Sequence, residues 1–212
     1  RELEADGVDK SKIHVTGVPV DSVFENPPGR AESREYLGLH PDSRYVLAMG
    51  GGNGLGLEAI HIKAIEETPG VDGVIVIAGC NQRLESEVRC LAPTIGRHGK
   101  PVERIIFSMV TQIEKLYAAA DVLVSKPGGL TMSEATAMKM PIVMISPLPG
   151  QEKRNAEFLL KSGAALMATG GSELKSLLSS IMVNPERLAE LSAGSCKVGR
   201  PEASRQIAKM SV

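Results

Sequence analysis

The segment Val122–Asn155, VLVSKPGGLTMSEATAMKMPIVMISPLPGQEKRN, restricts the possible fold of this chain more than any other stretch. A short apolar run ends at a glycine pair, a helical pattern follows, and a second apolar run ends at Pro-Leu-Pro-Gly before another helical pattern. Two such strands joined by a helix form a right-handed crossover and lie parallel in one sheet. The loops after both strands therefore emerge at the same sheet edge, where open α/β sheets bind ligands.

The same alternation extends over most of the chain. Strands rich in β-branched residues are predicted at Tyr45–Met49, Gly73–Ala78, Val102–Phe107, Val122–Val124, Ile142–Ile145 and Ala165–Ala168. Helices are predicted at Ala31–Leu39, Leu57–Glu66, Gln82–Ile95, Thr111–Ala120, Met132–Met138 and Gln151–Ser162, and the chain from Ser172 onward is helical in composition. We therefore expect an α/β protein with a Rossmann-like parallel sheet of about six strands flanked by helices.

The start of the chain is predicted to lie outside this sheet domain. Residues 1–20 have the pattern of the end of a connection from a preceding domain, with a strand-like run at Ile13–Val20 that stops at Gly and Pro. The turn-rich stretch that follows is expected to be a surface loop. We assign residues 21–198 to the sheet domain.

Composition and charge exclude several classes of protein. The 24 basic and 25 acidic residues nearly cancel, which gives no reason to expect a nucleic-acid partner. The three cysteines are odd in number and lack metal-ligand spacing, which favours a reducing compartment and no zinc site. No apolar run approaches the roughly 20 residues of a membrane span, and the charged start is unlike a signal peptide. We expect a cytoplasmic protein.

The sequence GGGNGLG, Gly50–Gly56, lies between a predicted strand and a predicted helix. Glycines let backbone N–H groups approach a phosphate, and a helix N-terminus adds partial positive charge, so the loop favours diphosphate binding; such turns also occur without a ligand. Residues 79–81, at the end of the next strand, lack the acid that a dinucleotide ribose requires. The only Gly-Lys pair is followed by Pro101, which excludes a P-loop.

The sequence SKPGGLTMSE after the strand at Val122 has two interpretations. Thr131 and Glu134 have the spacing of a capping box, as Thr111 and Glu114 do elsewhere in the chain. Alternatively, the glycine pair at 128–129 opens the helix N-terminus to a phosphate while Glu134 binds a ribose diol. The local sequence leaves both interpretations open.

The sequence PGQEKRN at the start of the last helix of this unit is also ambiguous. The adjacent amide of Gln151 and carboxylate of Glu152 supply donors and acceptors that suit a sugar. A solvated first turn, with an acid favoured by the helix dipole, explains the same residues without a ligand. Taken alone, the motif favours the solvated turn.

Together, these motifs resemble a known family. SKPGGLTMSEA and PIVMISPLPGQEKRNAEFLLKSGAA, preceded by HVTGVPV and MGGGNGLG, are similar to the C-terminal domain of the processive diacylglycerol glucosyltransferases and monogalactosyldiacylglycerol synthases. These enzymes belong to glycosyltransferase family 28, which also holds the peptidoglycan UDP-N-acetylglucosamine transferase. The resemblance spans roughly Ile13–Ala168. It implies the C-terminal half of a two-domain GT-B enzyme, which binds the UDP-sugar while the N-terminal half binds the acceptor.

The resemblance also implies a set of donor-site residues on one sheet edge. They are Gly51, Gly52, Asn53, Gly54, Phe107, Val110, Gly128, Gly129, Thr131, Glu134, Gln151, Glu152 and Asn155. The glycines would face the diphosphate, and the turn from Phe107 to Val110 would frame the uracil. Glu134 would bind the ribose, and Gln151 and Glu152 the sugar hydroxyls. Thr131 and Glu134 still suit a capping box as well.

The activity that the resemblance implies is transfer of a hexose from UDP-glucose or UDP-galactose to a diacylglycerol-type lipid, with inversion and without a cofactor. The four histidines pair with no nucleophile or carboxylate, so no catalytic residue is predicted. The base and the lipid acceptor would belong to the N-terminal domain, to which a helix at 199–212 would return. These residues alone are therefore expected to bind a UDP-sugar weakly and transfer nothing. The full-length protein is expected to be peripheral at the inner face of the cell membrane.

Three alternatives remain beside this function. One is a peptidoglycan-type UDP-N-acetylglucosamine transferase. A UDP-sugar 2-epimerase would share the fold and the nucleotide but would need acid and base residues near the cleft. A non-catalytic nucleotide-binding module is the third.

One position departs from the family pattern. The family usually has Ala-x-Gly-x-Pro after the helix that follows the glycine pair, whereas this chain has Lys139 in place of that glycine. If residue 139 is a left-handed helix cap, lysine should cost on the order of 1 kcal/mol relative to glycine.

Overall fold

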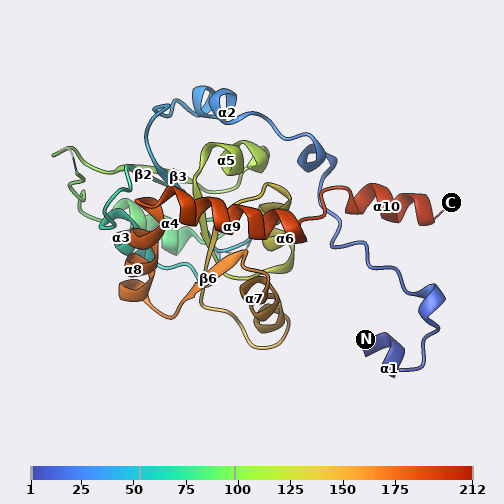
Figure 1. The fold of residues 1–212 in the computed structure, drawn as a ribbon. Coiled ribbons are helices and arrows are strands. Elements are labelled where there is room, and N and C mark those ends of the chain that lie inside the picture. The colour runs from blue at the N-terminus through green and yellow to red at the C-terminus, as the bar shows by residue number, and fades with distance from the viewer. Residues whose placement is uncertain (1, 53, 98, 212) are drawn as a thin grey trace.

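The computed structural model describes residues 2–52, 54–97 and 99–211. Within these residues, six strands form one sheet in the order β3-β2-β1-β4-β5-β6, and every strand pair is parallel (Figure 1). The strands are β1 (Tyr45–Met49), β2 (Gly73–Ile77), β3 (Glu103–Phe107), β4 (Val122–Ser125), β5 (Ile142–Ile145) and β6 (Ala165–Ala168). The predicted α/β fold and all six predicted strands of the sheet are confirmed, with ends that differ by at most one residue.

Helices precede, separate and follow the strands. They are α1 (Glu2–Ala5), α2 (Arg30–Leu37), α3 (Ala59–Glu66), α4 (Gln82–Arg89), α5 (Ile113–Ala119), α6 (Gly129–Ala137), α7 (Gln151–Lys161), α8 (Gly171–Met182), α9 (Pro185–Val198) and α10 (Ala203–Met210), with 3-10 turns η1 (Lys10–Lys12) and η2 (Ser22–Glu25). Helix α4 ends earlier than predicted, because Pro93 disfavours helical geometry in the residue before it. No helix in these ranges is long and apolar enough to cross a bilayer.

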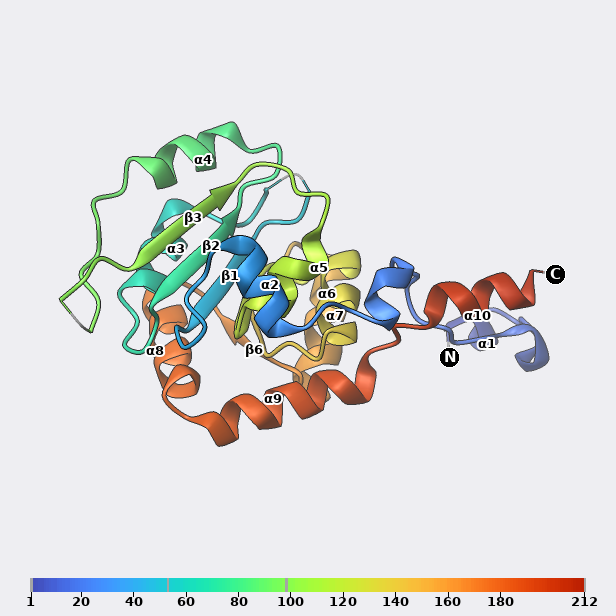
Figure 2. The same ribbon diagram turned by 90° about the horizontal axis from the view of Figure 1, so that it is seen from above.

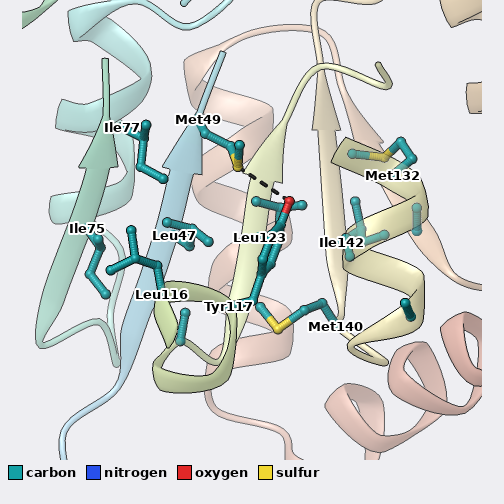
Figure 3. Close-up of a cluster of buried hydrophobic side chains, with 14 of the residues drawn as sticks. Leu47, Met49, Ile75, Ile77, Leu116, Tyr117, Leu123, Met132, Met140 and Ile142 are labelled. Carbon is teal, nitrogen blue, oxygen red and sulfur yellow. Dashed lines mark hydrogen bonds between the residues drawn. The ribbon is translucent and has the colours of Figure 1, made fainter. Parts of the chain in front are cut away.

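Both faces of the sheet are covered by helices, as successive strand residues alternate in direction. Leu47, Ile75 and Leu123 point into one core with α5, α6 and α7 (Figure 3), whereas Val46 and Val74 point into a second core with α3, α4 and α8. All five side chains are essentially buried. With both faces filled, a ligand can approach the sheet only at its edges.

The strand order reverses direction between β1 and β4. The chain builds β1, β2 and β3 outward on one side and then β4, β5 and β6 outward on the other. The loops after β1 and β4 therefore leave in opposite directions and open a crevice at the carboxyl edge of the sheet, the usual ligand position in such folds. The glycine loop follows β1, and SKPGG spans the end of β4 and the start of α6.

The predicted strand at Ile13–Val20 is wrong. This segment is extended but pairs with no strand in the described chain. Instead it packs along α10 and the turn before it, with Gly17 against Arg200 and the Val20 carbonyl accepting the hydroxyl of Ser204. Both segments lie beyond the sheet (Figures 1 and 2). An extended run forms a strand only where a sheet edge is available. The assignment of the chain ends to a connection with another domain stays a prediction.

Both predicted capping boxes are also wrong. Helix α6 begins at Gly129 with Gly128 as N-cap, so Thr131 lies inside the first turn rather than at its cap. Helix α5 begins at Ile113, with Gln112 rather than Thr111 as N-cap, and no side-chain cap bond forms there. Gly128, in the extended conformation, is the N-cap of α6, and Thr131 is one of the buried residues of the helix.

The end of α6 confirms the left-handed cap. Lys139 has φ 56° directly after the C-cap residue, and the N–H of Met140 donates to the Ala135 carbonyl at 2.9 Å. Helix α7 ends in the same way, with Gly163 at φ 72° in the matching position. The two helices therefore use one C-terminal motif with a lysine in one and a glycine in the other.

We expect Lys139→Gly to raise the free energy of unfolding by about 1 kcal/mol, because glycine adopts the left-handed conformation without the steric cost of a Cβ. The reciprocal change Gly163→Lys should lower it by a similar amount, since a Cβ at Gly163 meets no atom within 4 Å and only the backbone cost remains. Urea denaturation of both variants measures this. An unchanged or lower midpoint for Lys139→Gly would contradict the expected cost at residue 139.

Candidate functional site

The glycine loop after β1 is folded tightly against the end of β2. Gly54 has φ 61°, and a Cβ there would lie 2.2 Å from the Ala78 carbonyl oxygen. A Cβ at Gly50 would lie 2.5 Å from the carbonyl carbon of Gly54. The side-chain amide of Asn81 donates to the Gly54 carbonyl at 3.0 Å and fixes the loop. Gly50 and Gly54 are therefore required by packing, whether or not a ligand binds.

Gly51 and Gly52 have open space where a side chain would be. A Cβ at Gly52 would meet no atom within 4 Å, and one at Gly51 would meet only the Lys126 stem, at 3.5 Å. These two residues expose the backbone of the loop at the crevice, which is the geometry that close approach to a phosphate needs. The predicted site residue Asn53 lies outside the described residues.

The turn after β3 is joined to the glycine loop through the end of β2. The N–H groups of Ala78 and Gly79 donate to the carbonyls of Phe107 and Ser108, both at 2.9 Å, and the N–H of Cys80 donates to the Gly52 carbonyl at 3.3 Å. The side chains of Phe107 and Val110 pack against the core. The structure thus brings the predicted base turn and the predicted phosphate loop to neighbouring strand ends.

The N-termini of α6 and α7 converge at the same edge. The position of a Cβ on Gly129 lies 3.7 Å from the amide nitrogen of Gln151 and 3.9 Å from that of Asn155. The Asn155 amide donates to the Pro127 carbonyl at 3.0 Å, which ties α7 to the loop before α6. A Cβ at Gly128 would meet no atom within 4 Å. Two helix N-termini with partial positive charge therefore face the crevice beside these amides.

Glu134 is held inside α6 by a buried tyrosine. Its Oε2 accepts the Tyr117 hydroxyl at 3.1 Å, and the same hydroxyl lies 3.6 Å from Met49 Sδ (Figure 3). Burial raises the pKa of Glu134, and the tyrosine hydrogen bond partly opposes this shift. Burial and the Glu134 charge raise the pKa of Tyr117 well above its usual value, which keeps its hydroxyl a donor. Thr131, also predicted as a site residue, is buried.

Lys126, in the loop between β4 and α6, was not predicted as a site residue. Its Cδ lies 3.5 Å from the Cβ position of Gly56, and its Cε lies 3.5 Å from that of Gly51, so its stem crosses the glycine loop. Its Nζ lies 3.1 Å from Oε1 of Glu152, and both side chains are 15% exposed. Its position directly after a buried strand, at the switch point of the sheet, was the sequence signal that could have indicated a site residue. The glycine pair beside it was the more prominent motif.

Ser146, directly after β5, is a second residue that the sequence patterns missed. It has φ 43°, an uncommon value for a residue other than glycine, and its Cβ lies 3.7 Å from the Cβ position of Gly56. Such strained residues cluster at functional sites. It is exposed and contributes a hydroxyl to the rim of the crevice.

Cavities lie at both edges of the sheet, and one of about 470 Å³ lies beside the glycine loop, lined by Gly54, Gly56 and Asn81. Another of about 270 Å³ adjoins the site and is lined by Gly129, Gln151 and Asn155 on one side and by Val15 and Phe158 on the other. A third cavity of about 400 Å³ lies at the opposite, amino-terminal edge of the sheet, and none of the predicted site residues lines it. The converging loops, rather than cavity size, define the candidate site.

Solved structures share this fold. MurG from Acinetobacter baumannii is 21% identical, with a TM-score of 0.69 over 99% of this chain and 62% of that chain. The Anabaena protein HepE in complex with UDP and glucose is 17% identical, with a TM-score of 0.64 over 91% and 54%. UDP-GlcNAc 2-epimerase from Neisseria meningitidis bound to UDP-GlcNAc is 12% identical, with a TM-score of 0.68 over 99% and 57%. The fold is that of the C-terminal domain of GT-B glycosyltransferases.

Residues 73–207 match the glycosyltransferase family 28 C-terminal domain, and the chain belongs to this family. The processive diacylglycerol beta-glucosyltransferase of Bacillus licheniformis is 31% identical over 188 residues, 87% of this chain and 47% of that protein. The chloroplastic monogalactosyldiacylglycerol synthase 2 of Arabidopsis thaliana is 30% identical over 213 residues, 96% of this chain and 44% of that protein. The chain therefore spans about half the length of these curated relatives. The family resemblance predicted from the motifs is confirmed.

The packing of the glycine loop predicts two different outcomes for alanine. Gly54→Ala should lower the free energy of unfolding by about 2–4 kcal/mol, because it combines a left-handed backbone with an overlap on Ala78. Gly52→Ala, in open space two residues away, should change it by no more than about 0.5 kcal/mol. Urea denaturation compares them. Equal destabilisation would show that the loop does not have this packing.

Proposed function

We propose that this chain binds the UDP-sugar donor of an inverting glycosyltransferase that transfers a hexose to a diacylglycerol-type lipid. The observation that carries the proposal is the convergence, at the β1/β4 switch point, of open glycine backbone, two helix N-termini and the half-buried carboxylate of Glu134. Family membership supports the reaction class. The names of the two curated relatives support the lipid acceptor.

Each part of the site has a task in this proposal. The N–H groups of Gly51, Gly52 and the α6 N-terminus face the diphosphate, whose negative charge grows as UDP leaves the sugar. Glu134 accepts the ribose hydroxyls with its second carboxylate oxygen while Tyr117 holds the first. The turn after β3 frames the uracil.

The sugar end lies at the start of α7 in this proposal. Gln151 and Asn155 offer amides to the hydroxyls, and Glu152 offers a carboxylate. The acceptor hydroxyl attacks the anomeric carbon from the side opposite the departing UDP, which inverts the configuration. We assign no base to this chain: the base and the acceptor site belong to the part of the relatives that the chain does not span. The full-length protein would be peripheral at the inner face of the cell membrane.

Calorimetric titration with UDP, UDP-glucose and UDP-galactose tests the donor site directly. We expect the 212-residue chain to bind UDP and at least one of the two UDP-sugars, and to transfer no hexose to diacylglycerol vesicles. The full-length protein should perform the transfer. Absence of UDP binding at millimolar concentration would overturn the donor site. Hexose transfer by these residues alone would overturn the assignment of the base and the acceptor site to another part of the protein.

A UDP-sugar 2-epimerase is the clearest competing function, because epimerases share the fold. Incubating the full-length protein with UDP-N-acetylglucosamine and following the sugar configuration by NMR separates the two. Epimerisation without an acceptor would replace the transferase proposal. Transfer of N-acetylglucosamine to a lipid-linked peptidoglycan precursor would instead favour the peptidoglycan-type enzyme. Binding of the nucleotide sugar without any reaction would favour a non-catalytic module.

Gly128→Ala should weaken UDP binding by about 1.5–3 kcal/mol, because its Cβ would occupy the space through which the phosphate reaches the α6 N-terminus. Gly29→Ala is the matched control: Gly29 is the N-cap of α2 with nearly the same backbone angles and equally open surroundings. Both variants should lose about 0.5–1 kcal/mol of stability. Equal UDP affinity in both variants would argue against phosphate at Gly128.

Glu134→Gln should weaken UDP binding by about 1–3 kcal/mol, because the neutral amide loses the charge-assisted hydrogen bonds to the ribose. The exposed Glu157, on α7, provides the control variant Glu157→Gln, which should leave the affinity unchanged. Calorimetry at pH 7 measures both. An unchanged dissociation constant for Glu134→Gln would leave the carboxylate with only its structural contact to Tyr117.

A further inference from the structure

One ion pair at the candidate site joins its two predicted ends. Lys126 comes from the loop between β4 and α6, beside the predicted diphosphate loop, and Glu152 comes from the first turn of α7, at the predicted sugar end. Their charged atoms lie 3.1 Å apart and both side chains are mostly shielded from water. No other ion pair in the described chain links the loops of this site.

The two partners differ in how firmly they are held. Oε2 of Glu152 accepts the backbone N–H of Leu148 at 2.9 Å, so its carboxylate stays anchored to the loop after β5 without the lysine. The backbone of Lys126 is fixed, because its carbonyl accepts the N–H of Gly128 at 2.8 Å and the Ser125 hydroxyl at 3.1 Å. The lysine ammonium, at the end of a flexible four-carbon stem, is the part that can move.

The stem of Lys126 already lies across the loop where a diphosphate would sit. It passes 3.5 Å from the Cβ positions of both Gly51 and Gly56. A rotation about its side-chain bonds is therefore enough to move the ammonium from Glu152 toward an anion on the glycine loop. A diphosphate carries more negative charge than one carboxylate, so it competes for the cation effectively.

We propose that the Lys126–Glu152 ion pair is exchanged when the donor binds, so that diphosphate recognition releases the carboxylate that recognises the sugar. This inference rests on the proposed function. Without donor, the pair neutralises both groups. With the diphosphate in place, Lys126 turns to the phosphates, and Glu152, still held by Leu148, accepts sugar hydroxyls.

If the ion pair is exchanged, replacing Glu152 should affect UDP affinity in the opposite direction to replacing a residue that only contacts the ligand. Glu152→Gln keeps an oxygen for the Leu148 N–H but removes the charge that competes for Lys126. It should therefore tighten binding of UDP, which has no sugar, by about three- to tenfold. The same variant should bind UDP-glucose no more tightly than UDP, because the sugar-binding carboxylate is gone. Lys126→Met should weaken both ligands.

A double-mutant cycle tests the coupling by calorimetry with UDP and UDP-glucose. In the Lys126→Met background, adding Glu152→Gln should no longer tighten UDP, since no cation remains to be released. Glu157→Gln, on the same helix, should change neither affinity in either background. Thermal unfolding of every variant identifies a folding defect, and Lys126→Gln replaces Lys126→Met if the latter is unstable.

The outcomes separate this inference from the function on which it rests. If the unmodified chain binds UDP and Glu152→Gln binds it equally or more weakly, the exchange is wrong while the donor site stands. Tighter UDP binding that persists without Lys126 also overturns it. If the unmodified chain binds no UDP, the proposed function itself fails.

Discussion

The parallel pairing of β1 with β4 is the interaction on which the candidate site depends. Residues Val46–Met49 align with Val122–Ser125 in register, so the loops after both strands start side by side at the carboxyl edge. Because the strand order reverses between these two strands, their loops diverge and leave the crevice between them. The next pair, β4 with β5, brings Ser146 and the start of α7 to the same edge. A shift of one residue in any pairing would turn core side chains toward the wrong face.

Glycine serves two purposes in this site, and only the structure separates them. Gly50 and Gly54 allow the loop after β1 to pack on itself and on the end of β2. Gly52 and Gly128 meet no obstacle and have ordinary backbone angles, so their lack of a side chain leaves room in the crevice rather than relieving packing. Gly51 also has open space, but its φ of 71° favours glycine by itself. A motif of consecutive glycines therefore mixes residues under structural constraint with residues that leave room for a ligand.

The strands were predictable because short β-branched runs separated by helical patterns have few other solutions. The details that failed depend on tertiary contacts. The capping box at α6 was wrong because Thr131 is a buried residue inside the helix and Glu134 pairs with Tyr117, seventeen positions away. Nothing local indicates that pairing. Lys126 and Ser146 were missed for a similar reason: the ion pair with Glu152 joins two crossovers, and a left-handed φ at serine has no sequence signature. The strand at Ile13–Val20 failed because strand propensity does not supply a partner.

The two carboxylates of the proposed site are held in different ways, which in our proposal gives an order of recognition. Glu134 is held by a neutral donor, Tyr117, in a half-buried position that raises its pKa. A raised pKa means that the folded chain binds its proton more tightly than the unfolded chain, so stability is greatest below the unfolded pKa and falls as pH rises through the folded pKa. The ionised carboxylate of Glu134 therefore destabilises the fold, and hydrogen bonds from ribose hydroxyls would stabilise it as soon as the nucleotide binds. Glu152 instead forms an ion pair with Lys126. In the proposed exchange it becomes available only after a competing anion has bound the lysine. A site built in this way would engage the nucleotide first and the sugar second.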